Sequence, residues 1–232
     1  MPGQTVTEKL NQLEEQVLTL GDLVESLLVG AADLLREANL DALDRLNDEG
    51  HQVHRKRLAI EMACLSLIAG RRPLDGELRP LVAMVEIAAE LERLAEHARR
   101  VGRANFLTAD PRLRGPVASL YRLAAMVQSL LDGALAAFAR RDAVAARTVA
   151  ARTREVKDLY QQVRYALLAV IKTNPRITNQ AIFLSRAAYN LRRAAERVVD
   201  ICEWVVFAVE GSLAADMPAS EGLTPPEGTL AS

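Results

Sequence analysis

Residues 24–31 read Val-Glu-Ser-Leu-Leu-Val-Gly-Ala, and residues 127–134 read Val-Gln-Ser-Leu-Leu-Asp-Gly-Ala. One octet therefore occurs twice, about 103 positions apart, and the match extends from it to Asn39 and Asp142. Internal similarity over so long a period indicates a duplicated domain rather than a solenoid of short repeats. We therefore expect two equivalent units, whose shared and differing residues point to the function.

The composition favours a helical protein. The 232 residues are 50% hydrophobic and 25% charged, which suits a buried core and two domains of roughly 100 residues each. Aromatic residues make up only 4%, and the apolar residues are mainly Ala, Leu and Val, a mixture that favours packed helices over sheets. A formal net charge of −1 gives no bulk attraction to nucleic acid, so no nucleic-acid partner is expected.

The chain also carries no targeting signal that we recognise. Its N-terminal residues lack a basic segment followed by an apolar run, so no secretory signal is expected. No stretch of about 20 apolar residues is present, so no membrane span is expected. Cys64 and Cys202 lie in apolar helical stretches, which predicts buried free thiols in a reducing cytosol.

Apolar residues recur at steps of three and four along the chain, which places them on one face of a helix. Asn39 and Asp142 are predicted to cap the second helix of each unit, because their side chains can accept a bond from a free backbone N–H. Those helices are expected to run to about Ile68 and Ile171, ahead of proline turns. The stripe of the first helix comprises Leu10, Leu13, Val17, Leu20, Val24, Leu27, Ala31 and Leu34.

The sequence thus predicts an all-α fold of six helices, arranged as two tandem three-helix bundles related by internal duplication. The first bundle is predicted over residues 8–105 and the second over residues 116–211. Residues 212–232 contain few large apolar side chains and are predicted to form a disordered tail.

No catalytic signature is found in the sequence, so we do not expect an enzyme. A Gly-rich phosphate loop and a Gly-x-Ser-x-Gly elbow are both missing. A di-iron bundle would need Glu three positions before a histidine, and none of His51, His54 and His97 meets this condition.

The most informative segment is residues 90–97, Glu-Leu-Glu-Arg-Leu-Ala-Glu-His. Glu92 and Glu96 are four residues apart and so lie about one turn apart on one helix face. Two carboxylates placed this way repel each other unless a cation or a basic side chain lies between them, so one interpretation is a metal site. The alternative is a solvated acidic edge paired with nearby arginines, namely Arg93, Arg99 and Arg100.

This segment resembles the third-helix motif of the PhoU family, approximately Asp-Leu-Glu-Arg-Ile-Gly-Asp-His. Residues 156–160, Val-Lys-Asp-Leu-Tyr, and residues 203–207, Glu-Trp-Val-Val-Phe, are also similar to family segments. The likeness covers residues 8 to 211 and implies two tandem three-helix bundles. It further implies a cytoplasmic adaptor that negatively regulates phosphate uptake and starvation signalling. The implied partners are the ATPase subunit of a phosphate ABC transporter and a sensor histidine kinase.

The second copy of the motif departs from the family pattern. Arg192 takes the place of the first acid, Arg197 replaces the histidine, and Lys157 replaces an acid on the neighbouring helix. These positive charges would repel a cation, so we expect Glu196 to be ion-paired with a basic neighbour instead.

The first copy keeps its acids. His54 falls where the family usually has Asn or Asp, next to the acid pair. A site of His54, Glu92 and Glu96 would mix nitrogen and oxygen ligands, which suits Zn, Fe or Mn. The alternative is a His–Glu hydrogen bond without metal. Any transition metal is therefore expected in the first repeat only.

Two further functions remain open at this stage. One is a metal-binding or storage bundle, and the other is a regulatory module of a different transporter. A homodimer is expected, with contact to the membrane only through partner proteins. Trp204 could be an exposed anchor for a partner, but a single tryptophan in a helical stripe favours a place in the core.

Overall fold

The computed structural model describes residues 5–35, 39–71, 75–103 and 110–212. Within these ranges the predicted six long helices are present and no strand occurs. The first three are α1 (Val6–Leu34), α2 (Leu40–Arg71) and α3 (Asp75–Arg103), and the last three are α4 (Arg114–Arg140), α5 (Ala143–Thr173) and α6 (Thr178–Glu210). Short 3-10 turns, η1 (Pro111–Leu113) and η2 (Pro175–Ile177), precede α4 and α6. Of the tail predicted over residues 212–232, all but Ser212 lies outside the described residues.

Local signals set the helix ends. The Asn39 side chain accepts from the Ala42 N–H at 3.0 Å, and the Asp142 side chain accepts from the Ala145 N–H at 2.9 Å, which confirms both predicted caps. The second helices run slightly beyond the expected Ile68 and Ile171, because a helix can continue until the residue before the proline turn. Pro175 does open η2, whereas Pro73 lies outside the described residues.

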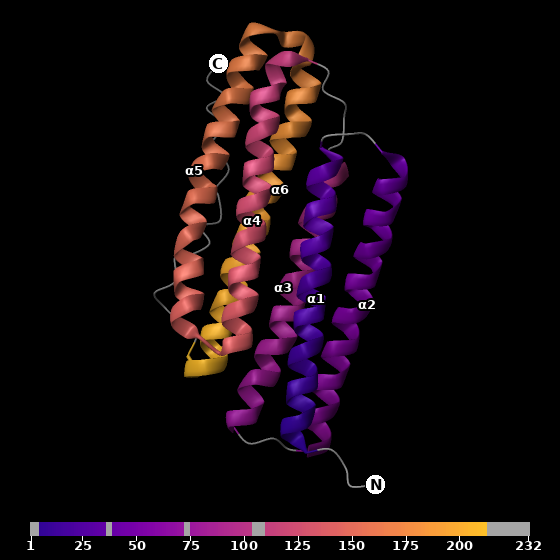
Figure 1. Cartoon of the computed structure of the whole chain (residues 1–232), viewed down its shortest axis with the longest axis vertical. Helices are drawn as coiled ribbons and strands as arrows, with labels where there is room; N and C mark the ends of the chain where they lie inside the picture. Colours follow the sequence, from indigo (N-terminus) through magenta and orange to yellow (C-terminus); the bar gives the residue numbers. More distant parts are fainter. Residues whose placement is uncertain (1–4, 36–38, 72–74, 104–109, 213–232) are drawn as a thin grey trace, which may run out of the picture.

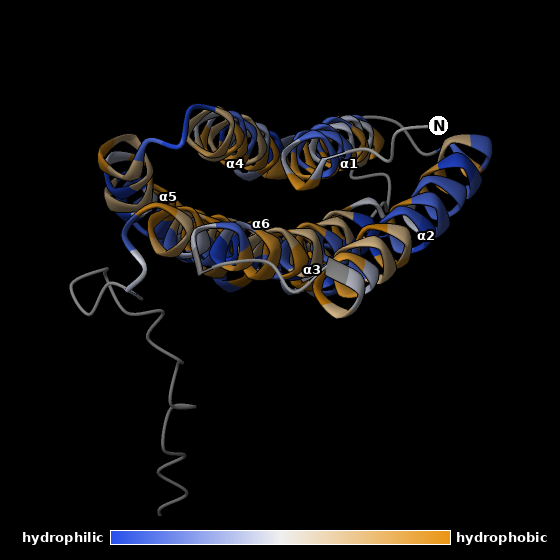
Figure 2. Cartoon of the chain, turned by 90° about the horizontal axis from the view of Figure 1, so that it is seen from below, coloured by the Kyte–Doolittle hydropathy of each residue, from blue (hydrophilic) through white to orange (hydrophobic). Residues whose placement is uncertain are grey.

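The two bundles lie side by side with their long axes nearly parallel (Figure 1). Seen from the end, α5, α6, α3 and α2 form one curved layer, and α4 and α1 cover its concave side (Figure 2). The bundles meet through α3 against α6 and through α1 against α4. Both pairs run antiparallel, so the duplicated halves are related by an approximate two-fold axis (Figure 1).

Contacts across the junction show this symmetry at the level of single residues. Gln128 donates to Glu25 at 2.7 Å, and these residues hold the same place in the repeated octet. Their pairing puts the octets on the two-fold axis, where a residue meets its own equivalent. The octet that identifies the duplication is thus also part of the contact between the halves.

The predicted apolar stripes form one continuous core. Every residue of the α1 stripe from Leu10 to Leu34 is buried, and so are the free thiols of Cys64 and Cys202. Burial raises the pKa of Cys64 to about 11 and that of Cys202 to about 12, so both remain protonated. Trp204 is partly buried against the core, with its ring edge-on to Phe207.

No membrane span is expected from the sequence, and one apolar helical segment nevertheless meets the criteria of length and composition for one. In the described residues, the helical segment Pro111–Arg140 is long and apolar enough to cross a membrane by length and composition. Half of its most apolar window is buried inside the protein. The apolar residues of this helix supply the core stripe of the second bundle, which accounts for its composition.

Candidate functional site

The motif on α3 divides its side chains between two faces of the helix. Glu90 and His97 face α6, where they contact Arg197 and Asn190. Glu92 and Glu96 lie on the side of α2 and the solvent. This division follows from the helical rotation of about 100° per residue. One motif therefore serves both the junction between the bundles and a separate surface cluster.

Glu92 lies at the centre of that cluster. Its Oε1 is 2.6 Å from His54 Nδ1, and its Oε2 accepts from Arg57 Nε at 2.7 Å. Arg57 also pairs with Glu61 one turn further along α2. Partial burial alone would raise the pKa of Glu92, but the hydrogen bonds from Arg57 and His54 outweigh it and the pKa lies below its usual value. Glu92 is therefore an ionised carboxylate with both oxygens engaged.

Glu96 belongs to a different ion pair. Its oxygens accept from Arg99 Nη1 and Arg100 Nε, each at 3.1 Å. Arg99 also reaches Asn47 on α2 at 3.2 Å. It packs against α2 at Gly50, where an added Cβ would overlap the Arg99 side chain at Cδ. The absence of a side chain at Gly50 thus leaves room for Arg99 in the position described.

A cavity of about 460 Å³ opens over both clusters. All three histidines of the chain line it, together with Glu92, Glu96 and three arginines. Only His54 contacts one of the two acids, because His97 is turned toward Asn190 of α6 at 3.1 Å. Burial, and then the charges of neighbouring arginines, lower the pKa of His97.

The arrangement fits a metal ion poorly. It brings together His54 and Glu92 but not Glu96, the third residue of the expected site, because Arg99 and Arg100 hold Glu96. In the described part of the chain, no three His, Cys, Asp or Glu side chains are grouped to hold a metal. A cation would also have to displace Arg57 from Glu92. The described contacts match the expected His–Glu hydrogen bond and the expected pairing of Glu96 with Arg99 and Arg100, whereas Arg93 pairs with Glu90 instead.

The second repeat carries the expected ion pair. Glu196 is only 5% exposed and pairs with both Arg192 and Arg193, which confirms that a basic neighbour holds it. The buried Arg192 guanidinium lies over the rings of Tyr160 and Tyr189, at 5.5 and 5.4 Å from their centroids. Tyr160 holds the place that Arg57 has in the first repeat, and Arg192 holds the place of Glu92, so the cation lies on the second helix of the first repeat and on the third helix of the second repeat.

Arg197 is not part of that second cluster, although the sequence places it among the positive charges that would repel a cation there. It reaches across to Glu90 of α3 at 3.1 Å and pairs with Asp200 at 2.9 Å. Glu90 also accepts from Arg93. Residues at 90 and 190 are equivalent, as are those at 97 and 197, so Glu90–Arg197 and Asn190–His97 are two copies of one contact.

Sequence reasoning missed this junction cluster, because the equivalence of the two motifs does not show which helices of the two bundles face each other. Glu90 is 4% exposed, and Asp200 and Glu203 lie close to it on α6. Burial, and then repulsion among these carboxylates, raises the pKa of Glu90 and of Glu203, and burial raises that of Asp200. The junction therefore holds three carboxylates that ionise less readily than usual.

Comparison with known proteins identifies relatives for both repeats. A family model described as the PhoU domain matches the chain twice, over residues 17–104 and 120–205. The chain is 27% identical over 229 residues to a phosphate-specific transport system accessory protein PhoU homolog of Zymomonas mobilis, covering 95% of this chain and 97% of that protein. It is 26% identical over 203 residues to the PhoU protein of Escherichia coli, covering 88% of this chain and 84% of that protein.

Two solved structures share the fold. The crystal structure of PhoU from Pseudomonas aeruginosa superposes with a TM-score of 0.83 at 24% identity, over 90% of this chain and all of that chain (100%). The phosphate transport system regulatory protein PhoU from Streptococcus pneumoniae superposes with a TM-score of 0.81 at 22% identity, over 90% of this chain and 99% of that chain. These matches show that the paired three-helix bundles are a fold shared with both proteins.

Metal binding in the first repeat stays a prediction. Because Arg57 pairs with Glu92, the prediction now includes an effect of Arg57 on metal affinity. A Zn²⁺ ion must compete with Arg57 for Glu92, so Arg57→Ala should raise Zn²⁺ affinity about tenfold, equivalent to about 1.4 kcal/mol. Glu92→Ala should abolish binding at this site. Glu196→Gln is the matched control and should change nothing, because its neighbours are cations. Isothermal titration calorimetry measures all four proteins; Zn²⁺ uptake that is indifferent to Glu92→Ala would contradict the prediction.

The pKa of His97 predicts a pH dependence of stability. A histidine whose folded pKa lies below its unfolded value of about 6.5 favours folding above that pH. This contribution is lost as the pH falls through the folded pKa, by at most about 1.4 kcal/mol per pH unit. Between pH 7.5 and 5.5, wild type should therefore lose more free energy of unfolding than His97→Gln. Urea denaturation measures the difference, with the exposed His51→Gln as control; equal losses in all three proteins would contradict it.

Proposed function

The chain belongs to the PhoU family, and from that premise we propose that it is a regulatory adaptor of phosphate transport that works by binding other proteins. Two PhoU domain matches, one for each repeat, are the observation that carries this proposal. Curated relatives that align along nearly the whole chain are accessory proteins of phosphate-specific transport systems.

The chemistry of the cavity supports binding rather than catalysis. Glu92 is engaged by Arg57 and His54, and Glu96 by Arg99 and Arg100. General acid–base catalysis needs a group that is free to exchange a proton with a substrate near the working pH. Carboxylates held by guanidinium groups serve instead to fix helices against one another and to present a charged surface.

The proposed partners are the ATPase subunit of a phosphate ABC transporter and a sensor histidine kinase, both met at the cytoplasmic side of the membrane. The adaptor would bind one conformational state of each partner more tightly than the other, and so restrain uptake and signalling when phosphate is plentiful. Such coupling requires different contacts in the two states, and typically amounts to 1–3 kcal/mol.

A deletion strain tests the function. Without this gene, a reporter of phosphate-starvation genes should be expressed at high phosphate, because the restraint on signalling is gone. A plasmid copy of the wild-type gene should restore repression. Normal repression in the deletion strain would contradict the proposal.

A further inference from the structure

The outer face of α2 carries an uncharged surface near its C-terminal end. No exposed residue of α2 from Leu58 to Gly70 has a charged side chain. Met62 is 62% exposed and Leu65 is 49% exposed, and Glu61, the one charged residue in this span, pairs with Arg57. We call this surface the α2 strip, and it comprises Leu58, Ala59, Met62, Leu65, Ser66 and Ala69.

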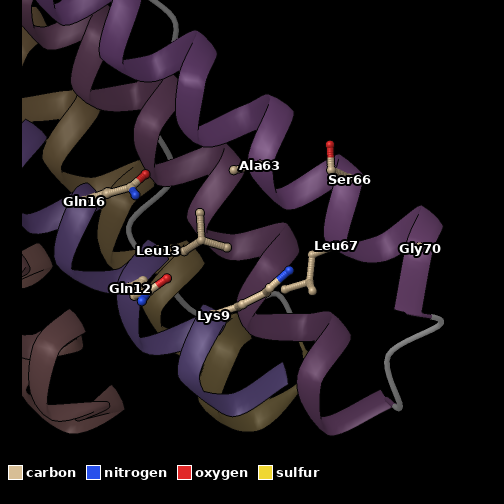
Figure 3. A pocket seen from close by; sticks show the side chains of 8 residues that line it. All are labelled: Lys9, Gln12, Leu13, Gln16, Ala63, Ser66, Leu67 and Gly70. Atoms are coloured by element: carbon tan, nitrogen blue, oxygen red, sulfur yellow. The ribbon is translucent and has the colours of Figure 1, made fainter. Parts of the chain in front are cut away.

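A groove runs beside the strip, between α1 and α2 (Figure 3). It encloses about 380 Å³ and is lined by Lys9, Leu13 and Gln16 of α1 and by Ala63, Leu67 and Gly70 of α2. Figure 3 shows Lys9 and Leu67 turned toward one another across the groove, with Leu13 deeper between the helices. Small residues on the α2 side leave room for a further helix to approach closely.

Positive charge marks both ends of this surface. Lys9 lies in the groove near the end of α2, and the exposed Arg55 and Lys56 lie about one turn before Ala59. Residues at spacings of i+3, i+4 and i+7 share a helix face, so Arg55 and Lys56 share the face of Ala59, Met62 and Ala63. An apolar strip about three turns long is thus bounded by cations.

We propose that the α2 strip and its groove bind an amphipathic helix of a partner protein that has an apolar face about three turns long and carboxylates at both ends. Laying an apolar helix face into a groove between helices is an established mode of peptide recognition. The proposal rests on the adaptor function proposed above and names the docking surface for it.

Charge argues against a second copy of this chain as the occupant. Two copies of the strip that lie along one another about a two-fold axis run either parallel or antiparallel. In the antiparallel pair, Arg55 and Lys56 of one copy meet Lys9 of the other. In the parallel pair, each of these cations lies next to the same residue of the other copy. Like charges at both ends oppose either pairing, whereas carboxylates on a different partner would be attracted.

The second repeat provides a matched control. Tyr165 and Leu168 hold the places on α5 that Met62 and Leu65 hold on α2, and they are 68% and 46% exposed. There, however, the exposed Arg164 and Lys172 interrupt the apolar face. Changes at Tyr165 and Leu168 therefore alter surface polarity equally without touching the proposed docking surface.

Binding of a defined helix tests the surface directly. The probe is a fluorescein-labelled peptide of about 16 residues with a Leu/Ala face and Glu at both ends, and a second probe carries Lys at those ends. Wild type should bind the Glu-ended probe at least about tenfold more tightly in fluorescence anisotropy. Met62→Glu/Leu65→Glu should weaken this binding about tenfold or more, and Tyr165→Glu/Leu168→Glu should not. Equal binding of both probes, or equal effects of both double variants, would overturn the proposal.

Two further measurements separate this proposal from its premise. In the deletion strain, Met62→Glu/Leu65→Glu should fail to restore repression, whereas the α5 double variant should restore it. Failure of wild type itself to restore repression would overturn the adaptor function, while the peptide data still decide the docking surface.

Circular dichroism should show unchanged helicity in both variants. A dimer of wild type that Met62→Glu/Leu65→Glu converts to monomer in light scattering would assign the surface to a second copy and overturn the proposal.

Discussion

A buried ion pair, Glu90 with Arg197, joins the two halves of the molecule where α3 meets α6. Glu90 is almost fully buried, and the Arg197 side chain is only 15% exposed. Removing one partner from such a pair leaves a buried charge and typically costs about 3–5 kcal/mol. Its pseudo-equivalent, His97 with Asn190, makes the same contact with much less charge. Together these contacts join α3 to α6, while Glu92 and Glu96 of the same helix lie on the side of α2.

Duplication has preserved the packing of this scaffold while its surface chemistry diverged. The first repeat holds Glu92 against Arg57, whereas the second holds Arg192 over Tyr160 and pairs it with Glu196. The outer helices diverge in the same way, because cations interrupt the exposed apolar face of α5 but not that of α2. The distinctive surfaces, a histidine-lined cavity and an uncharged strip, therefore both belong to the first repeat.

The sequence predicted whatever depends on local periodicity and capping. The apolar stripe of α1 and the caps at Asn39 and Asp142 follow from the chemistry of neighbouring residues, and the structure confirms them. The partners of Arg57 and Arg197 could not be predicted with the same rules. Arg57 reaches Glu92 only because of the register between α2 and α3, and Arg197 reaches Glu90 only because of the way two separate bundles face each other. Both depend on tertiary packing rather than on spacing along one helix.

A double-mutant cycle on Glu90→Gln and Arg197→Gln is the most direct test of this account. Urea unfolding of wild type, both single variants and the double variant gives the coupling free energy between the two side chains. If the pair fixes the junction, the coupling should be about 1–3 kcal/mol, within the range for contacting residues in one network. A coupling below about 0.5 kcal/mol, as expected for independent sites, would contradict the central role assigned to this ion pair.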